Sequence, residues 1–351
     1  MSDPTDVTET TERRIPAERG VVASRSASGG RALGTSFTAA ADSSVGRFDR
    51  PAALTIRGHR FDWGRRTYVM GIVNATPDSF SGDGLFRAGS ADARAGTAGT
   101  RDADAGVVER AVALARAMVA DGADLLDIGG ESSRPGHAPI DAEEEIRRVE
   151  PLVVAIRAAL PEVPISVDTI KPSVAAAALD AGADLVNDVW GVADDDRLAR
   201  VAAEHEAPII LTHNRAEARY RSLVAEVVAD LQRAIERTVA AGVAWDRIIV
   251  DPGFGFGKAP EHNLALLRDL ASLRLLARPI LLGTSRKSTL GLVLDLPADE
   301  RLEATLATTA LGIAAGVDIV RVHDVLANVR AARMTDAVVR PERPGTAESD
   351  A

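Results

Sequence analysis

The chain has 351 residues, and its 51 acidic residues outnumber its 41 lysines and arginines, which gives a formal net charge of -10. This charge argues against a general nucleic-acid-binding protein, because neutralising a phosphate backbone requires an excess of Lys and Arg. The sequence contains no cysteine, which excludes disulfides and thiolate metal sites and fits a reducing compartment. It has no apolar run long enough to span a membrane and no signal-peptide core, so we expect a cytoplasmic protein without a membrane partner.

The two ends of the chain are predicted to be disordered. Residues 1–48 are rich in Ser, Thr, Ala, Gly and Arg and lack apolar periodicity, so they bury too little surface to offset the entropy of ordering. A second polar tail is predicted over 341–351, which leaves 49–340 as one domain. At the start of that domain, the alternation between Ala53 and Tyr68, with Gly58 at a turn, predicts a small hairpin that could cap the bottom of a barrel.

The segment Val69–Gly84, VMGIVNATPDSFSGDG, carries the most information in the chain. A short apolar strand ends at Asn74 and runs into a Thr-Pro-Asp turn with later glycines. This pattern is typical of a barrel strand that leads into an active-site loop, although a tight structural turn is the alternative. The small, polar run from Leu85 to Gly106 predicts a long flexible loop before a helix that starts near Val107.

Seven further strands alternate with stretches of helical spacing. Three helix-to-strand junctions repeat one another (DGADLLD, AGADLVND and AGVDIVRV), and the Gly in each suits a left-handed helix end. Eight strand and helix pairs predict an α/β fold, a closed (β/α)8 TIM barrel, although an open doubly wound sheet would give a similar local pattern. Besides Val69–Val73, the predicted strands are Leu125–Ile128, Pro164–Val167, Leu185–Val189, Pro208–Leu211, Ile248–Val250, Ile280–Gly283 and Ile319–Val322.

Polar residues collect where the predicted strands end, the face on which barrels assemble their sites. Singly, each could cap a helix or be a satisfied core group. Together they form two sets. Asp168, Asn187 and Asp251 could pair with the donor edge of a planar, nitrogen-rich heterocycle. A second set could bind phosphate oxygens and a divalent cation: Arg134, Lys287, Arg321, His323 and, through its amide oxygen, Asn74.

Other motif interpretations fit less well. In Asp251–Lys258, DPGFGFGK, glycines alternate with phenylalanines, which does not match the GxGxxG of a dinucleotide site but allows a tight loop that brings a ring close to a flat ligand. Leu281–Ser288 lacks the glycine spacing of a P-loop. His213 and His323 lie on different predicted strands and form no HxH or HExxH pair, so metal-only chemistry is not expected.

With these motifs in order, the sequence resembles the dihydropteroate synthase family of folate biosynthesis over roughly Leu54–Val338. The matching motifs are GIVNATPDSFS, DIGGESSRPG, ISVDT, LVNDV, DPGFGFGK, SRKS and IVRVHDV. The resemblance implies a (β/α)8 barrel, usually a homodimer. It also implies a transferase that joins 6-hydroxymethyl-7,8-dihydropterin diphosphate to p-aminobenzoate with release of pyrophosphate, helped by Mg²⁺.

The resemblance also implies site residues, each taken from a matching motif position. Those expected at the pterin are Asp168, Asn187, Asp251, Phe256, Lys287 and Arg321. Those expected at the diphosphate are Asn74, Ser133, Arg134, Arg321 and His323, with Asn74 also on Mg²⁺. Those expected at p-aminobenzoate are Phe80, Pro135 and Ser288. Those expected to be catalytic are Asp83, Lys287, Arg321 and His323.

The sequence departs from the family pattern at three places. Ser133 replaces a common Thr and keeps the hydroxyl, whereas Thr212 and Asn214 stand where many members carry Met, which predicts a more polar pterin pocket. The first loop reads SGDG instead of SDGG, and Asp83 is the candidate for its carboxylate. The alternatives to a synthase are a pterin-dependent methyltransferase, which would not need the SRKS and RVH anion cluster, and a paralogue that binds pterin without turnover.

Overall fold

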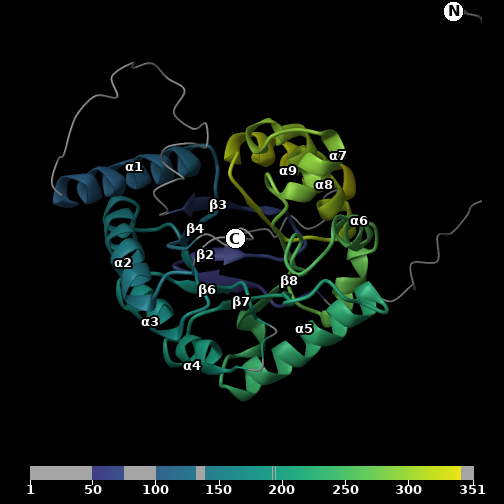
Figure 1. Ribbon diagram of the computed structural model, residues 1–351, viewed down its shortest axis with the longest axis horizontal. Coiled ribbons are helices and arrows are strands. Elements are labelled where there is room, and N and C mark those ends of the chain that lie inside the picture. The colour runs from purple at the N-terminus through teal and green to yellow at the C-terminus, as the bar shows by residue number, and fades with distance from the viewer. Residues whose placement is uncertain (1–49, 75–99, 132–138, 192, 194, 341–351) are drawn as a thin grey trace, which may run out of the picture. The chain divides into compact units, whose positions relative to one another are not determined.

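The computed structural model describes residues 50–74, 100–131, 139–191, 193 and 195–340 (Figure 1). Within these ranges strands and helices alternate along the chain, and each strand of the central sheet overlaps one that the sequence predicts. The strands of this sheet are β3 (Tyr68–Asn74), β4 (Leu125–Gly129), β5 (Ile165–Asp168), β6 (Leu185–Asp188), β7 (Ile209–Thr212), β8 (Ile248–Asp251), β9 (Leu281–Leu282) and β10 (Ile319–Val322).

The eight strands form a closed parallel ring. Their order is β8-β7-β6-β5-β4-β3-β10-β9, and every pair of neighbours is parallel. A parallel bridge between Val250 and Ile280 joins the two outer strands, and the Val250 N–H donates to the Pro279 carbonyl at 3.0 Å. The predicted (β/α)8 barrel is therefore confirmed, and the open doubly wound sheet is excluded.

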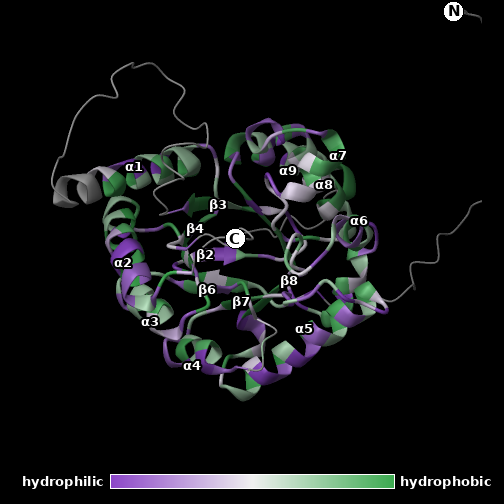
Figure 2. Ribbon diagram, in the orientation of Figure 1, coloured by the Kyte–Doolittle hydropathy of each residue, from purple (hydrophilic) through white to green (hydrophobic). Residues whose placement is uncertain are grey.

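Helices surround the ring because alternate strand residues point outward and are apolar. Leu126 and Val167 belong to a core that also contains Leu152 and Leu231 from the helices. Apolar and hydrophilic residues alternate along the helices (Figure 2). No helix in the described ranges is long and apolar enough to cross a membrane. The helices are α1 (Thr100–Ala120), α2 (Ala142–Ala159), α3 (Pro172–Asp180), α4 (Arg197–Glu204), α5 (Leu223–Ala240), α6 (Pro260–Arg268), α7 (Ser288–Leu294), α8 (Leu302–Ala315) and α9 (Val325–Val339).

A short hairpin closes the N-terminal end of the barrel. Strands β1 (Leu54–Ile56) and β2 (His59–Phe61) are antiparallel. Phe61 at the end of β2 forms an aromatic cluster with Trp63 and Tyr68, and the ring centres of Phe61 and Tyr68 lie 4.7 Å apart. This cluster shares one core with inward-facing residues at the beginnings of the barrel strands, including Leu125 and Leu185. The predicted hairpin and its position at the bottom of the barrel are both confirmed.

Helix ends show one confirmed prediction and one error. Gly122, Gly182 and Gly316 have φ angles of 101°, 110° and 103°, the left-handed conformation expected at the three repeated junctions. However, α1 begins at Thr100, seven residues before the predicted start at Val107. The predicted loop from Leu85 was therefore too long at its C-terminal end, because a run of small polar residues has no apolar period from which to locate a helix start.

Candidate active site

The carboxyl ends of the barrel strands bring the predicted polar residues together. In the strand register, Asn74 pairs with Gly129, Gly129 with Asp168, and Asp168 with Asn187, so one row crosses four strands. Asp251 ends β8, and Arg321 lies on β10. Because all the strands are parallel, their carboxyl ends share one face of the barrel, where TIM-barrel enzymes place their active sites.

Arg321 is the central cation of this face. Its Nε donates to Asp127 Oδ2 at 2.5 Å, and its Nη2 donates to Asp168 Oδ2 at 2.6 Å. Asn187 joins the same network by donating from Nδ2 to Asp127 Oδ2 at 3.1 Å. Burial lowers the pKa of Arg321, but the two carboxylates outweigh it and raise that pKa above its usual value. The guanidinium therefore remains charged inside the barrel.

Sequence reasoning missed Asp127. This residue is fully buried in the middle of β4, within the apolar run LLDIG, whereas the sequence prediction considered only polar residues at strand ends. The available signal was the period of two: Leu125, Asp127 and Gly129 alternate with Leu126 and Ile128, so the charge faces the barrel interior. A charge at that position requires a buried partner, which Arg321 supplies.

The glycine-rich segment after β8 forms a tight loop that approaches Lys287. Asp251 Oδ1 accepts a hydrogen bond from the Gly253 N–H at 2.7 Å. Gly255 has a φ of +82°, and a Cβ at this position would lie 2.8 Å from Lys287 Cδ. Lys287 Nζ donates to the Phe254 carbonyl and lies 4.1 Å from the centre of the Phe256 ring. The loop thus places a carboxylate, an aromatic ring and an ammonium group together.

Two titratable groups of this site are shifted toward neutral pH. Burial raises the pKa of Asp168 to about 7, although Arg321 opposes the shift. Burial lowers the pKa of Lys287 to about 8, opposed by the carboxylate of Asp251. Burial also raises the pKa of Asp251 itself. Perturbed pKa values of this kind are characteristic of functional sites.

His323 is held by the loop that follows β9. The Ser285 hydroxyl accepts from the His323 backbone N–H at 3.2 Å and lies 2.9 Å from its Nδ1. Next to this contact, Arg286 donates to both carboxylate oxygens of Asp324, at 2.7 and 3.1 Å. These bonds tie the loop after β9 to the loop after β10, so the backbone that carries Lys287 is fixed relative to His323.

Asn74 faces the same space as Asp168. A Cβ added at Gly129 would lie 3.7 Å from Asn74 Oδ1 and 3.8 Å from Asp168 Oδ2, so both oxygens flank this glycine. In the described parts of the chain, no three acidic or histidine side chains gather into a metal cage. Mg²⁺ commonly keeps several waters and binds substrate phosphates with only one or two protein ligands. The oxygens present here therefore fit a cation held mainly by a phosphorylated ligand.

The structure describes some of the remaining predicted site residues but not others. Ser288 begins α7 directly after Lys287. Thr212 is buried and pairs in register with Asp251, whereas the amide of Asn214 donates to the Val189 carbonyl at 3.1 Å. The residues that lie outside the described ranges are Phe80, Asp83, Ser133, Arg134 and Pro135.

Lys171 is a second residue that sequence reasoning missed. It precedes α3, and its Nζ contacts Glu131 and, at 2.5 Å, Oε2 of the buried Glu145 in α2. Glu131 belongs to the DIGGESSRPG motif, and residues 132–138 of the chain lie outside the described ranges. Lys171 therefore anchors the beginning of this loop to α2. No sequence pattern indicates the contact, because Lys171 precedes α3 whereas Glu131 and Glu145 belong to the preceding unit of β4 and α2.

A buried cluster supports the glycine loop from below. Lys258 Nζ donates to the carbonyls of Gly253 and Phe256, each at 3.0 Å, and lies 2.9 Å from His213 Nδ1. On its other side, His213 Nε2 lies 3.1 Å from Asp230 Oδ2. Burial lowers the pKa of His213 to about 4, so its imidazole is neutral near pH 7. The cluster therefore holds the glycine loop in shape, and the charges of Lys258 and Asp251 act on each other.

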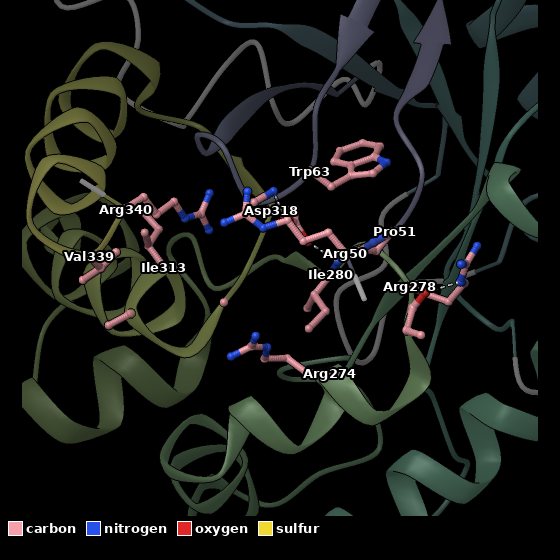
Figure 3. Close-up of a pocket in the computed structure, with 14 residues that line it drawn as sticks. Arg50, Pro51, Trp63, Arg274, Arg278, Ile280, Ile313, Asp318, Val339 and Arg340 are labelled. Carbon is pink, nitrogen blue, oxygen red and sulfur yellow. Dashed lines mark hydrogen bonds between the residues drawn. The ribbon is translucent and has the colours of Figure 1, made fainter. Parts of the chain in front are cut away.

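The opposite end of the barrel contains a separate cavity of about 210 Å³ (Figure 3). Its lining includes Trp63, Arg274 and Asp318. The Asp318 carboxylate already accepts from the N–H groups of Gly64 and Ile280, at 2.9 and 3.1 Å. Because Asp318 immediately precedes β10, this cavity lies at the N-terminal end of the barrel, away from the strand-end residues. We therefore take the residues at the carboxyl ends of the strands, and not this cavity, as the candidate active site.

Comparisons with known proteins show which proteins the chain is similar to. Residues 70–323 match the family model described as "Pterin binding enzyme". The chain is 46% identical over 288 residues to the dihydropteroate synthase of Clostridium beijerinckii, covering 82% of this chain and 100% of that protein. A Clostridium difficile dihydropteroate synthase crystallised in the presence of pteroic acid superposes with a TM-score of 0.71 and 45% identity, over 80% of this chain and 99% of that one. The Xanthomonas albilineans enzyme with 4-aminobenzoic acid gives 0.72 and 37%, over 84% and 100%.

Proposed function

This chain belongs to the dihydropteroate synthase family, transferases of folate biosynthesis, and we propose that its strand-end site joins 6-hydroxymethyl-7,8-dihydropterin diphosphate to p-aminobenzoate. The products are 7,8-dihydropteroate and pyrophosphate. The observation that carries the proposal is the meeting of Asp168, Asn187, Asp251 and Lys287 at one end of the barrel. The family relatives favour this synthase reaction over methyl transfer from a folate.

The pterin ring binds deepest in this proposal. Asp168, Asn187 and Asp251 supply carboxylate and amide groups for the N–H groups of the heterocycle, and buried polar groups of this kind require partners. Lys287 donates to a ring acceptor, and Phe256 packs against the ring from the glycine loop. Arg321 lies beside the ring and compensates the negative charge of Asp168.

The diphosphate binds above the ring. We assign it to Asn74, Ser133, Arg134, Arg321 and His323, all of which match family motif positions. Arg321 has already committed Nε to Asp127 and one N–H of Nη2 to Asp168, so Nη1 is the nitrogen best able to meet a phosphate oxygen. Asn74 would offer its amide oxygen to Mg²⁺. When bound, this ion would neutralise charge on the departing pyrophosphate.

The reaction requires bond breaking on one side of a carbon and bond making on the other. The pterin methylene C–O bond breaks, and its electron pair leaves with the pyrophosphate. The p-aminobenzoate nitrogen attacks the resulting cationic methylene, forms the C–N bond and gives up a proton. The amine substrate lies near Phe80, Pro135 and Ser288 in this proposal. The chain's own contribution is to hold two planar molecules in line and to stabilise the departing negative charge, with Lys287, Arg321, His323 and Asp83 as the catalytic groups.

We also propose that the enzyme is a homodimer. Leu292, Val293 and Leu294 of α7 and Leu311 of α8 are 46–67% exposed, and these helices contact each other. A second copy of the chain would cover this apolar surface, as the family resemblance implies. Sedimentation of wild type and of Leu292→Glu tests the assembly. A dimer that dissociates in the variant is expected, whereas a wild type that sediments as a monomer excludes it.

The proposed reaction is tested by incubating the purified chain with the pterin diphosphate, p-aminobenzoate and Mg²⁺. We expect dihydropteroate and pyrophosphate in equal amounts. Asp251→Ala is expected to weaken pterin binding by about 1.5–3 kcal/mol, the scale of one hydrogen bond to a charged group. Binding of pterin without formation of either product would instead identify a paralogue that has lost turnover.

A further inference from the structure

One buried oxygen of the proposed site has no partner within the described residues. Asp127 Oδ2 accepts from both Arg321 and Asn187, but Asp127 Oδ1 is buried and makes no hydrogen bond there. An unpaired buried acceptor is costly, and a carboxylate is among the costliest groups to bury. An aliphatic residue at this position would fit the rest of β4 without that cost, so the carboxylate needs a functional explanation.

The position of Asp127 places it directly beneath the row of site residues. On β4 the inward positions are Leu125, Asp127 and Gly129. Leu125 belongs to the apolar floor of the barrel, and Gly129 belongs to the row with Asn74 and Asp168. Asp127 therefore occupies the layer between the floor and the row. Its register partner on β5, Ser166, is also buried, with a hydroxyl that has no partner in the described structure.

The contact with Asp127 decides which atoms Asn187 presents to a ligand. An ionised carboxylate can only accept hydrogen bonds, so the Asn187 amide must turn its nitrogen toward Asp127. One N–H of the amide is then committed, and the amide oxygen with the second N–H remains for the ligand. The same carboxylate oxygen holds Arg321 Nε, which directs Nη2 toward Asp168.

We propose that Asp127 is a positioning residue for pterin recognition, which fixes the amide orientation of Asn187 and the guanidinium of Arg321. The inference rests on the proposed binding of the pterin at this end of the barrel. Replacing Asp127 by Asn keeps the size of the side chain but removes the acceptor-only edge. The new amide can face Asn187 with either its oxygen or its nitrogen, so the orientation of Asn187 is no longer determined.

The first test compares Asp127→Asn with Asp188→Asn by calorimetric titration with the unphosphorylated pterin and by steady-state kinetics. Asp188 lies on the opposite face of β6 from Asn187, and its Oδ1 accepts from the Trp190 N–H, a bond that Asn retains. We expect Asp127→Asn to raise the pterin Kd and the KM for the pterin diphosphate roughly tenfold to hundredfold. The KM for p-aminobenzoate and all constants of Asp188→Asn should stay at wild-type values.

A double-mutant cycle with Asn187→Ala separates positioning from a direct contact. If Asp127 acts partly through Asn187, adding Asp127→Asn to Asn187→Ala should raise the pterin Kd by a clearly smaller factor than in the wild-type background, and the remaining effect reports the contact with Arg321. Multiplication of the two single effects would overturn the proposal, as would wild-type pterin affinity in Asp127→Asn. A wild-type chain that binds no pterin would remove the proposed function itself, and the inference with it, so the two failures are distinguishable.

A swapped pair covers the case in which Asp127→Asn does not fold. Asp127→Asn combined with Asn187→Asp keeps one amide, one carboxylate and the net charge, and it restores an N–H to carboxylate hydrogen bond with the roles exchanged. The temperature of thermal unfolding should return toward the wild-type value. The pterin affinity should stay low, because a carboxylate now faces the ligand. Wild-type pterin affinity in the swapped pair would overturn the proposal.

Discussion

Arg321 Nη2 lies 2.6 Å from Asp168 Oδ2, although the two residues belong to β10 and β5, which are separated in the ring by β3 and β4. The bond therefore braces the barrel across its interior and does not join neighbouring strands. Because Arg321 also meets Asp127, one guanidinium compensates two buried carboxylates.

Removing this guanidinium should destabilise the fold. Arg321→Met leaves two buried carboxylates without their cation, and breaking a buried pair costs about 3–5 kcal/mol. Denaturant unfolding measures the loss. Arg200→Met is the control, because Arg200 and Asp196 form an exposed ion pair on the surface at α4. Equal losses in the free energy of unfolding would show that the cross-barrel ion pair stabilises the fold no more than a surface ion pair does.

Gly255→Ala should impair pterin binding more than folding. Gly255 and Gly58 have φ angles of +82° and +76°, so Ala at either position pays a similar left-handed cost of about 1–2 kcal/mol. Only at Gly255 would the new Cβ meet Lys287 Cδ, at 2.8 Å, whereas nothing lies within 4 Å at Gly58. The temperature of thermal unfolding should fall by a similar amount in both variants. The KM for the pterin diphosphate should rise only in Gly255→Ala. If the KM for the pterin diphosphate rose in neither variant, the position of Lys287 would not control pterin binding.

The pH dependence should be bell-shaped and narrow. Asp168 accepts hydrogen bonds as a carboxylate, which is present above its pKa of about 7. Lys287 is a cation below its pKa of about 8. The kcat/KM for the pterin diphosphate should therefore fall as the pH drops below the first value and as it rises above the second. Lys287→Arg should remove the alkaline limb, since a guanidinium stays charged. An alkaline limb that persists in this variant would belong to another group.

Phe61→Ala should lower stability without changing substrate affinity. Phe61 is 1% exposed and packs against Trp63 and Tyr68 at the N-terminal end of the barrel. Truncating a buried Phe costs about 3–5 kcal/mol. The KM values, measured below the unfolding transition, should match wild type because the site lies at the other end. A raised KM for either substrate would mean that the floor of the barrel controls the geometry of its mouth.

The strand-end half of the site was predictable because of how parallel strands are built. Asp168 and Asp251 each follow an apolar run, and the end of that run marks the position from which side chains enter the mouth of the barrel. The motif resemblance then assigned a ligand to each. Lys287 follows a two-residue strand, and its neighbours in the SRKS motif located it where periodicity alone was weak.

The residues that hold the site residues in place, such as Asp127 and Lys171, could not be predicted from the sequence. Asp127 lies inside a buried strand, and whether such a charge is paired depends on Arg321, far away in sequence. The contact between Lys171 and Glu145 likewise joins separate units and leaves no local pattern. The start of α1 was placed too late because small polar residues suit helices and loops alike. Sequence periodicity reports which face is buried, but it does not report which charges meet there.

The aromatic cluster of Phe61, Trp63 and Tyr68 closes the N-terminal end of the barrel, so the proposed site opens only at the C-terminal end of the strands. In the proposed reaction the pterin lies deepest and the amine enters above it. Both substrates must then arrive, and both products must leave, through the same opening. If the proposed reaction is correct, this shared opening implies an order of binding in which the pterin diphosphate enters before p-aminobenzoate.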